Sequence, residues 1–193
     1  MKLYFNPLAC SLASRIAIYE RELSVELIAV DAAKQTSDGR NYRDIYPLGL
    51  VPALELADGS LLTENAAVLQ FLAAAPADRQ LQQWLSFISS ELHVWLGTLL
   101  SKDASADVKA WALEEVLPRL AHVDRHLAGR SQLLAEYSVA DGYLFAVLNW
   151  TAVLPQIDLA TYPQLAAFHV RMHARPAVAR AFAEERALYL AAQ

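Results

Sequence analysis

The single cysteine of this sequence, Cys10, could provide a reactive thiol. Cys10 follows a short apolar segment and the turn residues Asn6-Pro7, and a helical pattern begins directly after it at Ser11. A helix N-terminus offers unpaired N–H groups and partial positive charge, which favour a thiolate and lower the pKa of a cysteine. The alternative is a small buried hydrophobe, because free cysteine is among the most buried residue types. Ser11 is either the N-cap of the helix or a hydroxyl that donates a hydrogen bond to a bound thiolate.

Two further positions could hold a ligand with the polar groups of a peptide. Val51-Pro52 precedes a strand pattern, and a cis bond there would turn the Val51 N–H and C=O outward to pair with a peptide-like ligand. Thr63 can cap a helix that opens with Glu64 and Asn65. Because a helix N-terminus binds carboxylates, Glu64 and the Asn65 amide could clamp a group that carries both an ammonium and a carboxylate. Glu64 would also complement the helix dipole without any ligand.

The histidines have helical spacing. Two i, i+4 pairs occur, His122 with His126 and His169 with His173. Neither pair belongs to an HExxH motif or has a cysteine partner, so a solvated or half-buried helix face is the better interpretation, and no metal is expected. His93 is the histidine of most interest, since it lies on the first helix after the expected linker.

The elements that must position these residues change character near residue 76. Before that point, strand patterns cover 2–5, 25–30, 51–56 and 60–62, and helical patterns cover 11–22, 42–46 and 64–75. Asp58-Gly59 between the last two strands predicts a hairpin. The order β-α-β-α-β-β-α predicts a small, mixed, four-stranded sheet covered by helices.

Beyond Pro76 the strand signals disappear. Helical periodicity covers 80–101, 106–128, 139–153, 163–175 and 176–191. Ser138 and Asp141 match a capping box before an apolar run, which predicts the start of a buried helix. The sequence therefore predicts an α/β domain over 1–75, a linker at 76–80 and an all-helical domain over 81–193.

Composition narrows the partners and the compartment. The 193 residues carry a net charge of −5, and no Lys/Arg cluster stands out, so nucleic acid is not an expected partner. One cysteine allows no intrachain disulfide, which fits a reducing compartment. We expect a cytoplasmic protein without a membrane partner, because neither a signal peptide nor a membrane-spanning apolar run is visible.

Taken together, three stretches resemble the glutathione transferases, most closely the bacterial beta class. They are MKLYFNPLACSLASRIAI, YPLGLVPALELADGSLLTENAAVLQFLA and YSVADGYLFAVLNW, and RPAVARA near the end also matches. The resemblance runs over nearly the whole chain. It implies a thioredoxin-like N-terminal domain that binds glutathione, a helical C-terminal domain that binds the second substrate, and a homodimer.

The resemblance also implies roles for single residues. Cys10 lies where the beta class has a reactive cysteine that can form a mixed disulfide with glutathione, and Ser11 beside it is the second catalytic candidate. Val51 precedes the family's cis-proline, here Pro52, and its backbone would pair with the cysteinyl part of glutathione. Glutathione would further be bound by Glu64 and Asn65 at its γ-glutamyl end, by Lys34 at its other end, and by Ser86, Ser90, Glu91 and His93 from the next helix. The hydrophobic substrate pocket would be built around Trp95, Leu99, Trp111 and Tyr162.

Some positions depart from the family pattern. Phe5 stands where tyrosine-using relatives have the catalytic hydroxyl, so a tyrosine mechanism is excluded there. Asn65 replaces the usual Ser or Gly, Ser86 replaces an Asn, and Val94 replaces a frequent Lys. The chain is also shorter than usual between Ala75 and Trp84.

The leading hypothesis is conjugation, with glutathione as co-substrate. The helix N-terminus, with donors from Cys10 and Ser11, would lower the pKa of the glutathione thiol, and the thiolate would attack a small hydrophobic electrophile, a detoxification reaction. Two alternatives remain. In the first, Cys10 is the nucleophile of a glutathione-dependent thiol–disulfide oxidoreductase or peroxidase. In the second, the fold serves as a non-catalytic binding or interaction module.

Overall fold

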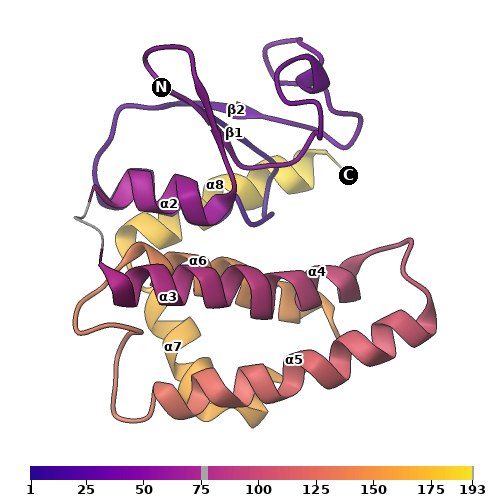
Figure 1. Cartoon of the computed structure of the whole chain (residues 1–193), viewed down its shortest axis with the longest axis vertical. Helices are drawn as coiled ribbons and strands as arrows, with labels where there is room; N and C mark the ends of the chain where they lie inside the picture. Colours follow the sequence, from indigo (N-terminus) through magenta and orange to yellow (C-terminus); the bar gives the residue numbers. More distant parts are fainter. Residues whose placement is uncertain (75–77, 193) are drawn as a thin grey trace. The chain divides into compact units, whose positions relative to one another are not determined.

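The structure, a computed structural model, describes residues 1–74 and 78–192 (Figure 1). Its contacts divide the chain into two units. The first unit comprises residues 1–75 together with 176–193, and the second comprises residues 76–175.

The first unit contains the predicted four-stranded mixed sheet. Its strands are β1 (Lys2–Phe5), β2 (Glu26–Ala29), β3 (Ala53–Glu55) and β4 (Leu61–Thr63), in the order β2-β1-β3-β4. β1 pairs with β2 in parallel and with β3 in antiparallel, and β3 and β4 form an antiparallel hairpin. Gly59 in the hairpin turn has a φ of 84°, which glycine adopts without steric cost. The hairpin predicted from Asp58-Gly59 is confirmed.

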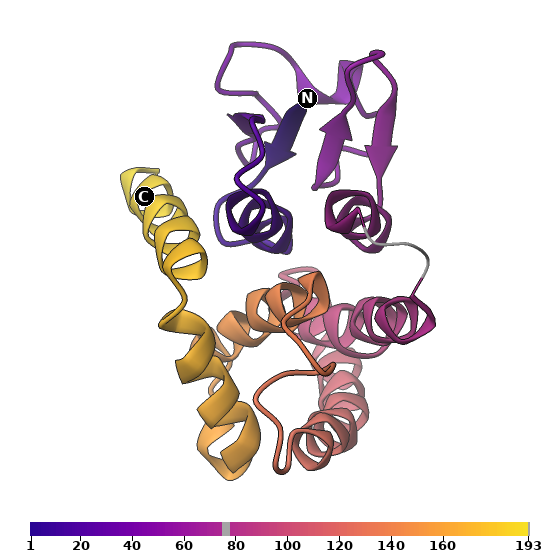
Figure 2. The ribbon, with the colours of Figure 1, turned by 90° about the vertical axis from the view of Figure 1, so that its left-hand side faces the viewer.

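Two helices cover one face of this sheet. α1 (Leu12–Glu20) and α2 (Asn65–Ala73) lie side by side beneath it (Figure 2). Strand residues alternate between the faces. Phe5 accordingly faces α1, where the Arg15 guanidinium lies 5.1 Å from its ring centroid. Tyr4 points the opposite way, into a small core with Tyr42 of the 3-10 turn η1 (Tyr42–Asp44).

The last helix groups with the first unit. α8 (Pro176–Ala191) packs on α1, whereas the sequence placed it at the end of the helical domain 81–193. The Arg15 guanidinium on α1 contributes to this packing, because it pairs with Glu184 and Glu185 of α8. The break predicted at Arg175-Pro176 is therefore also the point at which the chain passes from the second unit back to the first.

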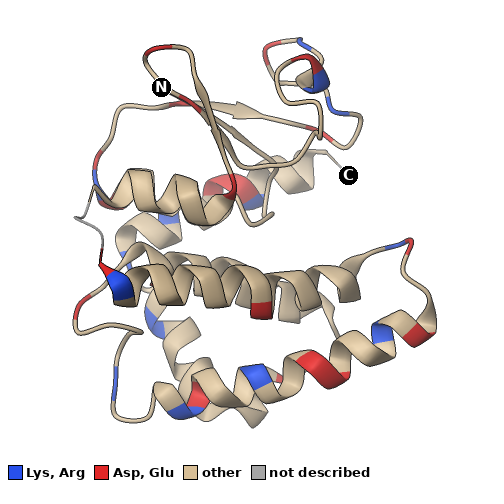
Figure 3. Cartoon of the chain, viewed as in Figure 1, with Lys and Arg blue, Asp and Glu red and all other residues tan. Residues whose placement is uncertain are grey.

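The second unit is helical. Its elements are α3 (Arg79–Phe87), η2 (Ile88–His93), α4 (Val94–Leu100), α5 (Ala106–His126), α6 (Val139–Leu148), η3 (Asn149–Val153), η4 (Leu159–Thr161) and α7 (Pro163–His173). Every residue of α6 is buried, so this helix forms the core of the unit. Acidic and basic residues are interspersed along α5, as on a solvated helix face (Figure 3).

Two helix starts depend on aspartate side chains. Asp78 caps α3 by accepting from the N–H groups of Gln80 and Leu81. Because α3 begins at Arg79, the end of the expected linker 76–80 is helical, while residues 76 and 77 lie outside the described residues. At the start of α6, the Asp141 carboxylate accepts from the N–H groups of Ser138 and Leu133, each at 2.8 Å. The capping role predicted for Ser138 and Asp141 is confirmed.

Among the described residues, none of the helices has the length and apolarity needed to cross a membrane.

Candidate active site

Cys10 lies in the turn between β1 and α1, almost fully buried at 7% exposure. Its thiol donates a hydrogen bond to the carbonyl oxygen of Val51, with 3.3 Å between Sγ and the oxygen. Burial raises the pKa of the Cys10 thiol to about 12, outweighing the backbone hydrogen bonds from Ser11 and Cys10 that lower it. The sequence left two interpretations of Cys10 open, a thiol with a lowered pKa and a small buried hydrophobe, and the structure supports the buried one.

The Val51-Pro52 peptide bond is cis, as the resemblance implied. The loop before it is anchored by Tyr42, whose hydroxyl donates to the carbonyl oxygen of Leu50 at 2.7 Å. Tyr42 is also hydrogen-bonded to Lys34, whose carbonyl oxygen accepts from the Tyr42 N–H at 2.8 Å. Lys34 has a φ of 64°, a conformation uncommon for a residue with a side chain.

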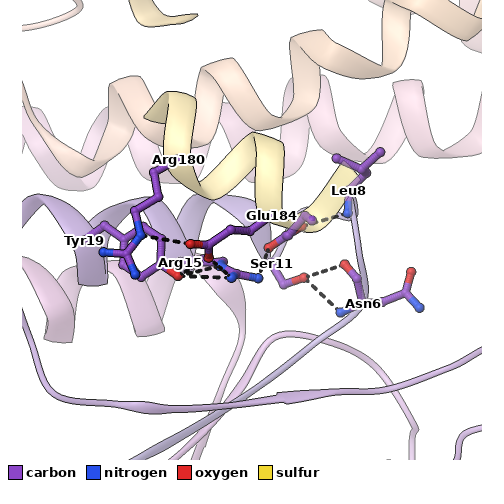
Figure 4. A network of polar contacts seen from close by, with 8 residues as sticks. Asn6, Leu8, Ser11, Arg15, Tyr19, Arg180 and Glu184 are labelled. Atoms are coloured by element: carbon purple, nitrogen blue, oxygen red, sulfur yellow. Dashed lines mark hydrogen bonds and ion pairs between the residues drawn. The ribbon is translucent and has the colours of Figure 1, made fainter. Parts of the chain in front are cut away.

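Ser11 occupies the N-cap position of α1, but its side chain does not cap the helix. Its hydroxyl instead turns back to Asn6, accepting from the Asn6 N–H and donating to the Asn6 carbonyl oxygen, both at 3.2 Å (Figure 4). Asn6 in turn donates through Nδ2 to the carbonyl oxygen of Val30 at 2.6 Å. The Ser11 hydroxyl therefore closes the turn that carries Cys10.

Glu64 and Asn65 begin α2 in different environments. Glu64 is exposed and has a φ of 67°, a left-handed conformation that costs a non-glycine residue free energy and that clusters at functional sites. Asn65 is buried, and its amide bonds to Ser14 of α1 and to the carbonyl oxygen of Cys10. The Asn65 amide, expected to clamp a ligand, thus faces the protein, while Glu64 faces solvent at the helix start.

A polar network that the sequence did not predict joins α8 to this turn (Figure 4). Arg15, buried at 5% exposure, bonds to Glu184, which also accepts from the Tyr19 hydroxyl at 2.5 Å and from Arg180 at 2.9 Å. Glu185 is fully buried and accepts from the N–H of Leu8 in the Cys10 turn at 2.7 Å. These contacts fix both the course of the turn and the position of α8.

The two glutamates of this network have opposite pKa shifts. Burial raises the pKa of Glu185 to about 7, against the lowering by the Leu8 N–H and Arg15. Burial also raises the pKa of Glu184, but hydrogen bonds from Tyr19, Arg180 and Arg15 outweigh the effect of burial. The pKa of Glu184 is therefore lowered to about 2. The hydrogen bonds that join Glu184 and Glu185 to α1 and to the Cys10 turn link residues 165 to 177 positions apart in the chain. Local periodicity therefore carried no signal for them.

The residues expected on the helix after the linker lie together in the second unit. Ser86 and Ser90 are exposed, and the Ser90 hydroxyl donates to the Ser86 carbonyl oxygen at 3.1 Å. Glu91 accepts from Arg119 at 2.6 Å. His93 Nδ1 lies 2.7 Å from the Tyr143 hydroxyl, and burial lowers the pKa of His93.

Three of these four residues lie in an irregular helical turn. Ser90, Glu91 and His93 belong to η2, a π-helical segment between two α-helices, where the sequence predicted one continuous helix over 80–101. Such segments are rare and often mark functional sites. The hydrophobic periodicity of this stretch is unbroken, so it could not reveal the wider turn.

The residues expected to build the hydrophobic pocket come from α4, α5 and the residue before α7. The rings of Trp95 and Trp111 meet edge to face, with centroids 4.9 Å apart. Leu99 is buried on α4, the helix that carries Trp95. Tyr162 instead donates through its hydroxyl to the carbonyl oxygen of Leu117, further along α5 than Trp111.

The described residues contain no group of three or more His, Cys, Asp or Glu side chains that could hold a metal ion. His169 and His173 are half-buried and pack on Phe145. His126 Nε2 lies 2.8 Å from the carbonyl oxygen of Leu133.

Comparison with known proteins extends these observations. Residues 9–75 match the family model of the glutathione S-transferase N-terminal domain. The chain is 36% identical to glutathione S-transferase GstA of Escherichia coli O157:H7, a similarity that covers 96% of this chain and 98% of that protein.

Two examples illustrate the solved structures that share the fold. A sphingomonad glutathione S-transferase complexed with glutathione has a TM-score of 0.90 at 40% identity, and the bacterial beta class enzyme of Sphingomonas chungbukensis has a TM-score of 0.90 at 36% identity. Each match covers 96% of this chain and 98% of the other. The fold is therefore a thioredoxin-like sheet domain with a helical region. The chain belongs to the glutathione S-transferase family, and it is an enzyme of the bacterial beta-class type.

Proposed function

We propose that this enzyme conjugates the thiolate of glutathione to small hydrophobic electrophiles. The observation that carries the proposal is the buried Cys10 thiol, which donates to the Val51 carbonyl oxygen beside the cis-proline. A thiol whose pKa is about 12 keeps its proton at neutral pH. It is suited to donate a hydrogen bond to a second sulfur and poorly suited to attack one.

In the first unit, glutathione would bind to the loop before Pro52 and to the start of α2. The cysteinyl backbone of glutathione would pair with Val51 beside Pro52, and its γ-glutamyl group would bind at Glu64 and the N-terminus of α2. Lys34 would approach the other end of the tripeptide. The further glutathione contacts that we propose are Ser86, Ser90, Glu91 and His93, and the electrophile would bind near Trp95, Leu99, Trp111 and Tyr162.

The chemistry requires a thiolate at neutral pH. The glutathione thiol releases its proton to solvent. The Cys10 S–H would turn from the Val51 carbonyl oxygen to the incoming sulfur and, together with backbone N–H groups of the turn, stabilise the resulting anion. Lowering a thiol pKa by about two units corresponds to roughly 2.7 kcal/mol, which charge-assisted hydrogen bonds can supply. The thiolate then forms a bond to the electrophilic carbon while the leaving group departs with its electron pair. The Ser11 hydroxyl supports this by keeping the turn closed.

A glutathione-dependent disulfide exchange through Cys10 is the second candidate, because backbone N–H groups of the helix start do face its sulfur. Cys10→Ser separates the two reactions. Under the proposed function it keeps conjugation within about tenfold of the wild type, the range expected for one lost hydrogen bond to an anion. Under the exchange reaction it abolishes glutathione-dependent disulfide reduction, because serine cannot form a mixed disulfide.

The direct test is turnover of glutathione with an activated aryl chloride, together with retention on a glutathione column. The proposal expects both, whereas a non-catalytic binding module would show no turnover. A chain with neither binding nor turnover contradicts the proposal. We also propose a homodimer in the cytoplasm, which light scattering of the purified chain and fractionation of its host cells would test.

A further inference from the structure

Asn65 connects two parts of the first unit that the proposed function uses separately. It is the first residue of α2 and is 6% exposed. Its Nδ2 donates to the carbonyl oxygen of Cys10 at 3.0 Å, and its Oδ1 accepts from the Ser14 hydroxyl at 2.8 Å. The carbonyl oxygen can only accept, so the amide nitrogen must face Cys10 and the amide oxygen must face Ser14.

An amide side chain supplies both the donor and the acceptor that this pair of bonds needs. A carboxylate could accept from Ser14 but could not donate to the Cys10 carbonyl. An apolar side chain would leave the Ser14 hydroxyl without its acceptor and the Cys10 carbonyl without this donor. The bonds are buried, and a buried polar group that loses its partner is costly.

The two partners of Asn65 belong to the turn and helix that carry the proposed sulfur site. Asn65 itself follows Glu64, at the proposed site for the γ-glutamyl group. A ligand that bridges both sites in one molecule binds well only if their separation is held. The other end of α2 has its own tie to α1, because Arg21 donates to the carbonyl oxygen of Leu72 at 2.6 Å.

We propose that Asn65 is a positioning residue, which holds the start of α2 at a fixed distance from the Cys10 turn so that the γ-glutamyl group and the sulfur of glutathione are bound together. This inference rests on the proposed function. Asn65 acts through Cys10 and Glu64 and does not itself need to touch the ligand.

The test compares Asn65→Ala with Arg21→Ala, which removes the tie between the same two helices at the far end of α2. Steady-state kinetics with glutathione and an activated aryl chloride would be measured across the neutral pH range, with a thermal melt of each variant. For Asn65→Ala we expect the KM for glutathione to rise about tenfold, the cost of a misplaced bridging ligand. We also expect the acidic limb of the kcat profile to move to higher pH. Arg21→Ala should lower the melting temperature and leave both quantities at wild-type values.

A general loss of stability would not separate the two variants in this way. Equal KM values and superimposable pH profiles for Asn65→Ala and the wild type would overturn the inference while leaving the proposed function intact. A wild-type chain without glutathione turnover would overturn both. If Asn65→Ala does not fold, Asn65→Leu fills the buried space, lacks both hydrogen bonds and must give the same KM increase.

Discussion

The Cys10 thiol donates to the carbonyl oxygen of Val51 across 3.3 Å, which joins the turn after β1 to the residue before the cis-proline. The two residues are 41 positions apart in the chain. Their contact places the only cysteine of the sequence at the backbone group proposed to pair with glutathione. The account of this enzyme depends on that contact, because it makes Cys10 a hydrogen-bond donor rather than an exposed nucleophile.

Cys10 should be alkylated slowly at neutral pH. Its pKa of about 12, against the ordinary value of 9.0, reduces the thiolate fraction on the order of 1000-fold relative to the unfolded chain. Iodoacetamide labelling of folded and urea-unfolded protein, followed by mass spectrometry, measures the ratio. The folded rate should keep rising with pH beyond pH 9. Equal rates for the two forms at pH 7 would contradict a protonated, buried thiol.

Glu64→Gly should make the chain more stable and a poorer glutathione binder. Glycine relieves the left-handed conformation at φ 67°, worth roughly 1 kcal/mol. Removal of the carboxylate should weaken glutathione binding roughly 10- to 100-fold, the value of hydrogen bonds to a charged group. Thermal melts and titration calorimetry measure the two effects.

Glu64→Ala is the matched control for this variant. It removes the same carboxylate and keeps the left-handed conformation, so it should bind glutathione as poorly as Glu64→Gly without the gain in stability. Wild-type affinity in both variants would exclude Glu64 from the site.

The adjacent residues Glu184 and Glu185 should give opposite pH dependences of stability. Glu184, with a folded pKa of about 2, stabilises the fold above its ordinary pKa of 4.5, and this contribution is lost as the pH falls toward 2. Glu185, with a folded pKa of about 7, favours the fold below pH 4.5, and this contribution is lost as the pH rises to 7.

Denaturant unfolding of Glu184→Gln and Glu185→Gln across pH measures these contributions. The deficit of Glu184→Gln relative to the wild type should shrink below pH 4.5. Glu185→Gln should gain on the wild type between pH 4.5 and 7. Parallel curves for all three proteins would show that neither carboxylate has a perturbed pKa.

Asp141→Ala should destabilise the second unit strongly. The fully buried carboxylate accepts from the N–H groups of Leu133 and Ser138. Leaving both donors unpaired costs about 2 to 4 kcal/mol of unfolding free energy. Asp158→Ala, which removes the exposed cap of η4, should cost about 1 kcal/mol or less. A similar small loss in Asp141→Ala would mean that water replaces the carboxylate.

Local patterns in the sequence predicted most of the fold. Asp58-Gly59 fixes a hairpin and Pro176 begins a helix, because each acts on the backbone of its immediate neighbours. The capping aspartate Asp141 could be predicted for the same reason. The π-helical segment at Ile88–His93 could not, since its apolar residues still follow a helical spacing.

The sequence identified several residues of the site but could not predict how deeply they are buried or which distant residues they contact. Cys10, Val51 and the start of α2 were identified, and the first two are in contact. For Cys10 the sequence could not decide between a lowered pKa and a buried thiol, because burial is set by elements distant in the chain. Glu184 and Glu185 were missed for the same reason, since their partners on α1 and in the Cys10 turn lie in the first residues of the chain.

The most direct test of the central claim is a crystal structure of the enzyme grown with excess glutathione. The account predicts the cysteinyl backbone paired with Val51, the γ-glutamyl carboxylate at the start of α2 near Glu64, and the glutathione sulfur within hydrogen-bonding distance of Cys10 Sγ. Glutathione bound elsewhere, with the Cys10 thiol still donating to Val51 and the start of α2 empty of ligand, would contradict it.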